Sequence, residues 1–198
     1  PIIGYPIEAA LKSGIFSEVM VSTDDIEIAT FAKMTGAEVP FLRSEKTSND
    51  TALINEVIGE VLDEYQKSGR KFEYLCCIFA TCPFITSKML KESFELIRNR
   101  QYDSVIPVIK YSHPIQRAFK VTAGRLSMFS PENFAKRTQD LEPAYFDSGS
   151  FYWMKVESFQ KNKKCLTENT GAFIIPEYSA VDIDTEEDWR RAEAVSDF

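Results

Sequence analysis

Apolar positions along the chain alternate between strand-like runs and helix-like stripes. Residues 6–16 carry apolar side chains at helical spacing, and Gly14 marks the end of this helix. Residues 17–23 predict a short buried strand, which is followed by a helix that Gly36 closes and by a second short strand at 38–42. A strand, a crossover helix and a strand at these lengths are typical of a parallel βαβ unit.

The same alternation continues to the end of the chain, with one interruption. A stripe of apolar residues over 53–65 predicts a core-facing helix, and the almost wholly apolar run 74–79 suits a central strand that is covered on both faces. Residues 111–143 break the pattern, because short strand-like segments flank a turn at Gly124 and predict a β-hairpin. The remaining expected elements are helices at 89–97, 156–159 and 185–192 and strands at 103–110, 150–155 and 171–181.

These elements predict one α/β domain over residues 1–198, with a β-hairpin insertion at 111–143. Its expected architecture is a three-layer, mostly parallel open sheet of the Rossmann-like type. The composition agrees, because 44% of the residues are hydrophobic and 27% are charged, which is ordinary for a globular protein and unlike a disordered tail.

The charge balance limits the kinds of partner. A net charge of -7 argues against nucleic-acid binding, which needs a clustered basic face, so an anionic ligand has to be met by local groups. No apolar run approaches the length of a membrane span and no secretory leader is recognisable, so we expect a cytoplasmic protein. The chain begins at Pro1 without an initiator methionine, and we expect further residues upstream of it.

The cysteines and the single histidine offer little catalytic chemistry. The four cysteines, Cys76, Cys77, Cys82 and Cys165, have neither the spacing of a zinc site nor that of a disulfide framework, which predicts buried, reduced thiols. His113 is the one histidine and stands in a loop, with no sign of a catalytic triad. A thiol enzyme built on Cys82 is a distant alternative, because no partner histidine is in view.

Two carboxylates near the end of the chain suggest metal chemistry. Asp182 and Asp184 stand where an apolar run ends, and in an extended segment residues i and i+2 point to the same side, so both can reach one cation. Mg²⁺ sites commonly combine one or two carboxylates with substrate phosphates and water. Capping of the final helix by Asp184 or Thr185 also explains these residue types, so both interpretations stay open at this point.

Three polar segments coincide with expected strand ends, namely 22–24, 80–83 and 182–184. In open α/β sheets, ligands bind outside the carboxyl ends of the strands. The coincidence therefore predicts a ligand site at that edge of the sheet.

Together with Arg43 and the stretch 147–152, these segments resemble the cytidylyltransferase family that activates nonulosonic, sialic-type sugars, the CMP-sugar synthetases. The resemblance covers essentially the whole chain and is strongest to the branch that acts on pseudaminic acid. It implies a nucleotide-sugar transferase fold in which the sugar hydroxyl attacks the α-phosphorus of CTP and pyrophosphate leaves, for surface glycan or flagellin glycosylation. It also implies Mg²⁺, or another divalent cation such as Mn²⁺, as cofactor.

The resemblance further implies roles for individual residues. CTP would be bound by Arg43, Ser22, Asp24, Phe79 and Thr81. The acidic nine-carbon sugar would be bound by Arg137, Gln139, Ser148, Gly149 and Tyr152. Metal binding and catalysis would fall to Asp182 and Asp184. A helix cap for Asp24 and a solvated loop charge for Arg43 are the alternative explanations.

Two departures from the family pattern bear on these expectations. Phe79 stands where sialic acid synthetases carry glutamine, which favours the pseudaminic branch over N-acetylneuraminic or legionaminic acid as substrate. The family's loop rich in glycine, lysine and arginine, which would wrap the triphosphate, would precede Pro1. The alternative of another class is therefore a nucleotide-binding or dimerising module without catalysis. The family builds its dimer contact in residues 111–143, so a homodimer is expected.

Overall fold

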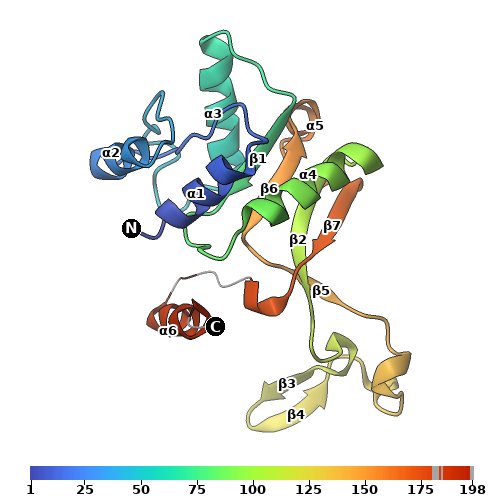
Figure 1. Cartoon of the computed structure of the whole chain (residues 1–198). Coiled ribbons are helices and arrows are strands. Elements are labelled where there is room, and N and C mark those ends of the chain that lie inside the picture. The colour runs from blue at the N-terminus through green and yellow to red at the C-terminus, as the bar shows by residue number, and fades with distance from the viewer. Residues whose placement is uncertain (180–182, 184, 197–198) are drawn as a thin grey trace.

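The computed structural model describes residues 1–179, 183 and 185–196, and a five-stranded sheet forms its centre (Figure 1). The strands of this sheet are β1 (Tyr74–Ile78), β2 (Ser104–Lys110), β5 (Tyr145–Asp147), β6 (Phe151–Lys155) and β7 (Thr170–Ile174). β6 lies between β1 and β2, and β2 also pairs with β5 and β7. β1, β2 and β7 run in one direction, whereas β5 and β6 run against them. The expected open α/β sheet is confirmed.

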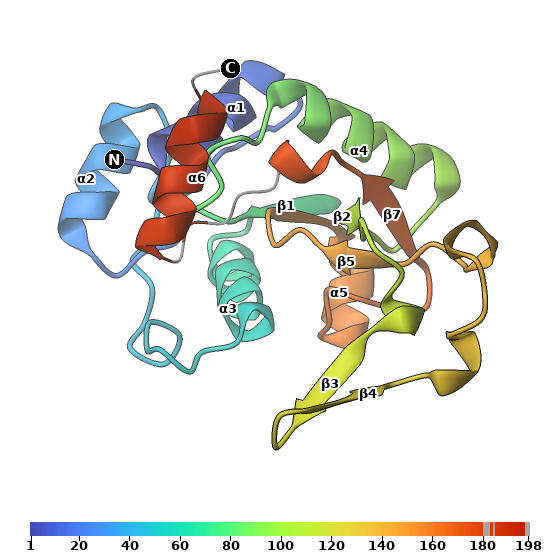
Figure 2. The same ribbon diagram turned by 90° about the horizontal axis from the view of Figure 1, so that it is seen from below.

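Helices cover both faces of this sheet. The α-helices of the described residues are α1 (Gly4–Ser13), α2 (Ile26–Met34), α3 (Ile54–Lys67), α4 (Ser87–Arg100), α5 (Val156–Asn162) and α6 (Glu186–Ser196), of which four cover the sheet. α1 and α4 pack on one face, around Leu90 and Trp153. α3 and α5 pack on the other face, around Leu62, Met154 and Phe159. Neighbouring residues of a strand point to opposite faces, so Trp153 and Met154 serve different layers of the expected three-layer arrangement. Figure 2 shows α1 and α4 on one side of the sheet and α3 and α5 on the other. Within the described residues, no helix is long and apolar enough to cross a membrane.

β2 is the most deeply buried strand. Its residues are buried up to Ile109, and its last residue, Lys110, is exposed. Pro107, which has no N–H, stands between the part of β2 that pairs with β6 and the part that pairs with β5. Its carbonyl accepts a hydrogen bond from the N–H of Ser148 (3.1 Å). A proline is tolerated within this strand because the ladder is interrupted at that point.

The N-terminal βαβ unit is less regular than the sequence predicts. The helix is present as α2, but the expected strands at 17–23 and 38–42 are reduced to one parallel bridge between Met20 and Glu38. Neither segment belongs to the five-stranded sheet. A regular strand needs ladder bonds along its length, and these two segments share only the bonds from Val21 to Glu38 (2.9 Å) and from Glu38 to Val19 (2.8 Å).

The predicted hairpin is present. β3 (Phe119–Thr122) and β4 (Arg125–Met128) pair antiparallel as a separate two-stranded sheet, which projects away from the main sheet (Figure 1). The turn residues Ala123 and Gly124 have φ angles of 49° and 75°. Two positive φ angles are what a tight hairpin turn needs, and glycine adopts such an angle without strain.

The last helix, α6, is capped by Thr185. The Thr185 hydroxyl accepts a hydrogen bond from the N–H of Asp188 (3.3 Å), and the Asp188 carboxylate accepts one from the N–H of Thr185 (3.0 Å). These reciprocal bonds form a capping box. Capping by Thr185, one of the two alternatives raised above, is therefore confirmed.

Candidate active site

The first part of the candidate site is built around Arg43, which is half-buried in the loop before α3. Its Nε donates to the hydroxyl of Ser22 (3.1 Å), and its Nη2 donates to the carbonyl of the same residue. Its backbone N–H donates to the carbonyl of Thr23 (2.9 Å). Two residues predicted to bind the nucleotide are thus in contact, and the guanidinium is anchored rather than a solvated loop charge.

Glu60, on α3, holds the loop that carries Arg43. Its carboxylate accepts hydrogen bonds from the N–H of Ser44 (2.7 Å), the hydroxyl of Ser44 (2.8 Å) and the hydroxyl of Thr47. Burial disfavours the charged form, but the hydrogen bonds from Thr47 and Ser44 and the charge of Arg43 outweigh it, so the pKa of Glu60 is lowered. The sequence analysis missed this residue, because nothing local links α3 to the loop.

The second part of the site is the turn between β5 and β6. Asp147 accepts hydrogen bonds from the N–H of Gly149 (2.9 Å) and from the hydroxyl of Tyr152 (2.6 Å). The hydroxyls of Ser148 and Ser150 are 2.7 Å apart and buried. Burial and the neighbouring Asp147 carboxylate both raise the pKa of Tyr152, so its phenol stays protonated. Three residues predicted to bind the sugar therefore lie in one ordered turn.

Phe79, at the carboxyl end of β1, joins the two parts. Its ring meets the ring of Tyr152 edge-on, with centroids 5.3 Å apart and an interplanar angle of 81°. Its N–H donates to the carbonyl of Ser150 (2.9 Å). Cys82, three residues further along, donates its thiol to the carbonyl of Gly149 (3.4 Å). This hydrogen bond holds the turn at Gly149, so Cys82 has a structural role in the site.

Asp24 is exposed and does not cap α2. The cap is Asp25, whose carboxylate accepts hydrogen bonds from the N–H groups of Glu27 (2.7 Å) and Ile28 (2.9 Å). The helix-cap alternative for Asp24 is therefore wrong by one residue. Its expected role at the nucleotide stays a prediction.

Arg137 and Gln139 lie in the insertion, on the segment that follows the hairpin. Arg137 makes a bidentate ion pair with Asp140, at 2.7 Å and 3.1 Å, and its side chain is 72% exposed. Gln139 is exposed as well. Within the described residues, neither side chain forms a hydrogen bond or ion pair with residues 147–152, so their role at the sugar stays a prediction.

The expected metal ligands Asp182 and Asp184 lie outside the described residues. In the part of the chain that the structure describes, no group of three or more histidine, cysteine, aspartate or glutamate side chains could hold a metal ion. Ile183 is described, and its N–H donates to the carbonyl of Thr81 (3.2 Å). This bond places Ile183 next to Thr81, just beyond the carboxyl end of β1.

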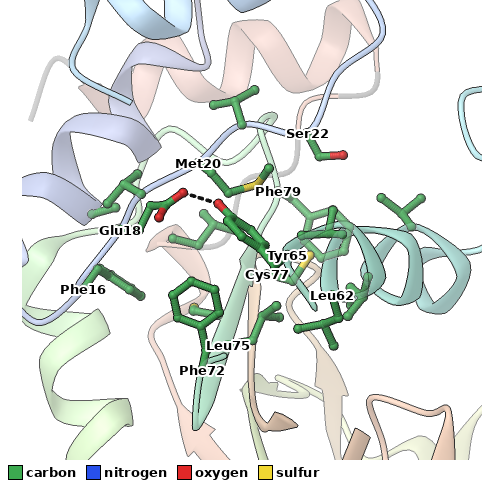
Figure 3. A pocket seen from close by; sticks show the side chains of 18 of the residues that line it. Phe16, Glu18, Met20, Ser22, Leu62, Tyr65, Phe72, Leu75, Cys77 and Phe79 are labelled. Atoms are coloured by element: carbon green, nitrogen blue, oxygen red, sulfur yellow. Dashed lines mark hydrogen bonds between the residues drawn. The ribbon is translucent and has the colours of Figure 1, made fainter. Parts of the chain in front are cut away.

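A groove of about 800 Å³ opens beside Ser22 and Phe79 (Figure 3). Most of its lining is apolar and comes from α1, α3, β1 and residues 15–22. Ser22, Arg43 and Phe79 also line it. The groove therefore leads from the first part of the candidate site, around Arg43 and Ser22, into the interior of the domain.

The groove contains one buried carboxylate, that of Glu18, whose side chain is 7% exposed. It accepts a hydrogen bond from the hydroxyl of Tyr65, drawn in Figure 3, and forms an ion pair with Arg70. Burial, followed by the bond to Glu18, raises the pKa of Tyr65. Tyr65 and Arg70 compensate the charge of Glu18. We therefore interpret this cluster as a structural part of the groove wall.

The cysteines are free, as expected. Cys82 and Cys165 are buried, whereas Cys76 and Cys77 are only half-buried because β1 borders the groove. Burial raises the pKa of the Cys165 thiol to about 11 and that of Cys77 to about 12. Such thiols are protonated at neutral pH and are poor nucleophiles.

The fold and the site define the class of protein. An open α/β sheet that gathers an anchored arginine, a polar turn and an aromatic pair at the carboxyl ends of its strands is typical of α/β proteins that bind small ligands there. Comparison with known proteins narrows this class, because the family model described as Cytidylyltransferase matches residues 1–170. The chain belongs to the cytidylyltransferase family, and it is a nucleotidyltransferase.

Curated relatives agree with this assignment. The chain is 33% identical to the pseudaminic acid cytidylyltransferase of Campylobacter jejuni over 189 residues, which cover 95% of this chain and 82% of the relative. It is 30% identical to the CMP-N,N'-diacetyllegionaminic acid synthase of Legionella pneumophila, over 98% of this chain and 84% of the relative. Among solved structures, the CMP:2-keto-3-deoxy-manno-octonic acid synthetase complexed with CTP matches with a TM-score of 0.69 and 14% identity, over 100% of this chain and 89% of that one. This last likeness supports the fold.

Proposed function

We propose that this protein transfers the cytidylyl group of CTP to a nonulosonic acid, with pseudaminic acid as the acceptor, and that pyrophosphate leaves. The product, CMP-pseudaminic acid, would serve surface glycan or flagellin glycosylation. The pseudaminic acid cytidylyltransferase of Campylobacter jejuni aligns with 95% of this chain, which supports this choice of acceptor. The observation that carries the proposal is the contact of Phe79 with Tyr152, because it joins the residues predicted to bind the nucleotide to those predicted to bind the sugar.

Transfer of a nucleotidyl group depends mainly on positioning and on compensation of charge. The net charge of -7 repels a triphosphate, so local cations are needed. Arg43 supplies a fixed positive charge at the nucleotide. Because Ser22 already holds its guanidinium, little ordering of this side chain is needed when the nucleotide binds.

We assign the divalent cation to Asp182 and Asp184. Carboxylate oxygens suit Mg²⁺, and the bond between Ile183 and Thr81 supports a position of this stretch at the carboxyl end of β1. When bound, the ion would offset charge on the phosphate oxygens and lower the pKa of the attacking hydroxyl.

Arg137 is the proposed partner of the sugar carboxylate. A guanidinium binds a carboxylate through two parallel hydrogen bonds, and Asp140 occupies this position in the structure. An exposed ion pair contributes only about 0–1 kcal/mol, so a substrate carboxylate can replace Asp140 at low cost. The other sugar contacts are assigned to Gln139 and to the turn that contains Ser148 and Gly149.

The hairpin is the proposed dimer contact. Large apolar side chains on it are exposed, with 68% for Val121, 69% for Leu126 and 66% for Phe129. A second copy of the chain would cover these side chains, and sedimentation equilibrium would measure the doubled mass. A cytoplasmic location is also proposed, because four free thiols suit a reducing compartment.

Pyrophosphate release tests the reaction. The protein, expressed with its upstream residues, is given CTP and Mg²⁺ with pseudaminic, N-acetylneuraminic or legionaminic acid in parallel. Release with pseudaminic acid, and none after addition of a chelator, is the expected result. Release only with N-acetylneuraminic or legionaminic acid would show that this acid, and not pseudaminic acid, is the acceptor. No release with any of the three acids would leave the non-catalytic binding module as the better explanation.

Asp184→Asn tests the metal assignment. The change keeps the size of the side chain and removes its charge, so turnover is expected to fall by at least about 100-fold while the fold is retained. The rate at saturating Mg²⁺ and the circular dichroism spectrum are measured together, with Glu186→Gln as the control for a nearby lost charge. An unchanged rate would remove Asp184 from the metal site.

A further inference from the structure

The turn between β5 and β6 hides its hydroxyl groups and exposes a carboxylate. Ser148 and Ser150 are only 6% and 0% exposed, and their hydroxyls lie 2.7 Å apart. Asp147, the last residue of β5, is exposed. The side-chain group that a ligand can reach on this turn is therefore the carboxylate of Asp147 rather than the hydroxyl of Ser148.

Asp147 lies at the edge of the sheet where ligands of open α/β folds bind. It pairs with Val108, close to the carboxyl end of β2. Its hydrogen-bond partner Tyr152 packs against Phe79, and Phe79 lines the groove that leads to Arg43. The carboxylate is thus placed at the same edge of the sheet as the residues predicted to bind the two substrates.

Part of the hydrogen-bonding capacity of Asp147 is used inside the turn. Oδ1 accepts the N–H of Gly149 (2.9 Å), and Oδ2 accepts the hydroxyl of Tyr152 (2.6 Å). An ionised carboxylate has about four lone-pair positions, so about two remain for a ligand. In the described part of the chain, no lysine, arginine or histidine forms an ion pair with Asp147. The turn therefore offers a fixed, negatively charged acceptor.

The charge decides which end of an acidic sugar can meet Asp147. Like charges repel each other, so the carboxylate of the sugar and the phosphates of CTP are disfavoured beside it. An ionised carboxylate accepts hydrogen bonds and donates none, so its ligand has to bring N–H or O–H groups. The part of the sugar that faces Asp147 is therefore neutral and carries donors.

We propose that Asp147 determines sugar specificity, and that its carboxylate accepts hydrogen bonds from the amide N–H groups of acylated amino substituents on the sugar. The inference rests on the proposed function and narrows its substrate class to nonulosonic acids with acylamino groups. The sugar then lies with its carboxylate toward Arg137 and its acylamino groups toward Asp147. A sugar without a donor at this position binds less tightly, because Asp147 loses water without gaining a hydrogen bond.

A purely local role for Asp147 is the alternative explanation. A side-chain oxygen that accepts the N–H two residues ahead forms an Asx turn, which aspartate and asparagine both make. This bond supports the left-handed conformation of Gly149, whose φ angle is 64°. The Asx turn needs neither the charge nor the second oxygen. Asp147→Asn therefore separates a local role from contact with the sugar.

Steady-state kinetics and calorimetric titration with N-acylated pseudaminic acid compare this variant with the unchanged protein. In Asp147→Asn the KM and the Kd for the sugar are expected to rise by about tenfold or more, while the KM for CTP and the circular dichroism spectrum stay the same. The loss should exceed that of Tyr152→Phe, which keeps the carboxylate. Glu142→Gln, which removes an exposed carboxylate nearby, is the matched control and should change neither constant. An unchanged KM and Kd for the sugar in Asp147→Asn would overturn the inference.

A change in the sugar tests the same bond from the other side. An analogue in which ester oxygens replace the amide N–H groups keeps the acyl groups but has no donors there. The unchanged protein should bind it about tenfold or more weakly than the N-acylated sugar, whereas Asp147→Asn should bind both with similar affinity. Equal discrimination by the two proteins would show that the donors are recognised elsewhere, which contradicts the inference.

Binding and turnover together separate this inference from the proposed function. A sugar whose binding depends on Asp147 but which gives no pyrophosphate would remove the proposed reaction and keep the inference. Normal pyrophosphate release with the same sugar KM and Kd in both proteins would do the reverse. A sugar that the unchanged protein neither binds nor converts would contradict both.

Discussion

The two parts of the candidate site are held together in different ways. Arg43 and Ser22, in the part predicted to bind the nucleotide (the nucleotide part), are 21 residues apart in the chain, and Glu60 reaches Ser44 over 16 residues. In the part predicted to bind the sugar (the sugar part), Asp147 bonds to residues only two and five positions away. A local turn keeps its geometry when distant segments shift, whereas the position of Arg43 depends on the walls of the groove. Nucleotide binding should therefore respond more strongly to changes elsewhere in the fold.

The largest expected effect separates the two parts directly. Arg43→Ala removes a pre-positioned cationic donor, so kcat/KM for CTP should fall by about 100-fold while the KM for the sugar stays unchanged. Arg43→Lys keeps the charge but not the planar pair of donors, and should give an intermediate loss. Steady-state kinetics with each substrate varied in turn provide the measurement. A rise in the sugar KM alone would place Arg43 in the other part of the site.

Arg137→Ala should act on the sugar part alone. Hydrogen bonds between charged groups contribute about 1.5–3 kcal/mol, so the KM for the sugar should rise by about tenfold or more, with little change for CTP. Asp140→Ala is the matched control, because it frees the guanidinium without removing it and should not raise the sugar KM. The free energy of unfolding should change little, since the pair is exposed. An increase confined to CTP would move Arg137 to the nucleotide.

Tyr152→Phe should have a smaller effect. It removes the hydroxyl that donates to Asp147 but keeps the ring against Phe79. A hydrogen bond to a charged group contributes about 1.5–3 kcal/mol, but this bond orders Tyr152 rather than contacting the sugar, so only part of it is lost and the sugar KM should rise about fivefold. Tyr145→Phe, on the exposed strand β5, is the control and should behave like the unchanged protein. Equal kinetics of both variants would show that the Asp147 bond does not order the sugar part.

Glu60→Gln gives the smallest expected effect and tests how far the nucleotide part depends on tertiary contacts. The pKa of Glu60 in the folded protein lies below its usual value of 4.5, so the charged carboxylate stabilises the fold above pH 4.5. This contribution is lost as the pH falls through the lowered pKa. The variant should be less stable by about 1 kcal/mol at pH 7, and the difference should disappear in acid.

The matched control for Glu60 is Asp63→Asn, which removes an exposed charge from the same helix. Urea unfolding at pH 7 and at pH 3 compares the two variants with the unchanged protein. A difference for Glu60→Gln that is the same at both pH values would show that the loop does not depend on the charged carboxylate.

Local signals were sufficient for the elements whose cause is local. The apolar stripe of α3, the turn at Ala123 and Gly124 and the cap at Thr185 all depend on residues within a few positions of one another. The stretch 147–152 was singled out by the family resemblance, and the bonds of Asp147 to Gly149 and Tyr152 within it came from the structure. The shift of the α2 cap from Asp24 to Asp25 shows how little residue type alone distinguishes neighbouring carboxylates.

Contacts between distant segments were beyond such signals. The apolar run of β1 predicted a strand covered on both faces, but not that β6 lies at one of its edges and the groove at the other. Glu60 looks like any charged residue on an exposed helix face until the chain folds back and places the loop of Ser44 and Thr47 over it.

Periodicity and turn chemistry were enough for the α/β class and the hairpin insertion, because each arises within a short stretch of chain. The expectation of nucleotide chemistry came from the family resemblance. The pairing of the strands and the contact between Phe79 and Tyr152 required the folded structure. These features depend on which segments meet in space, and residue types along the chain specify burial far more directly than they specify partners.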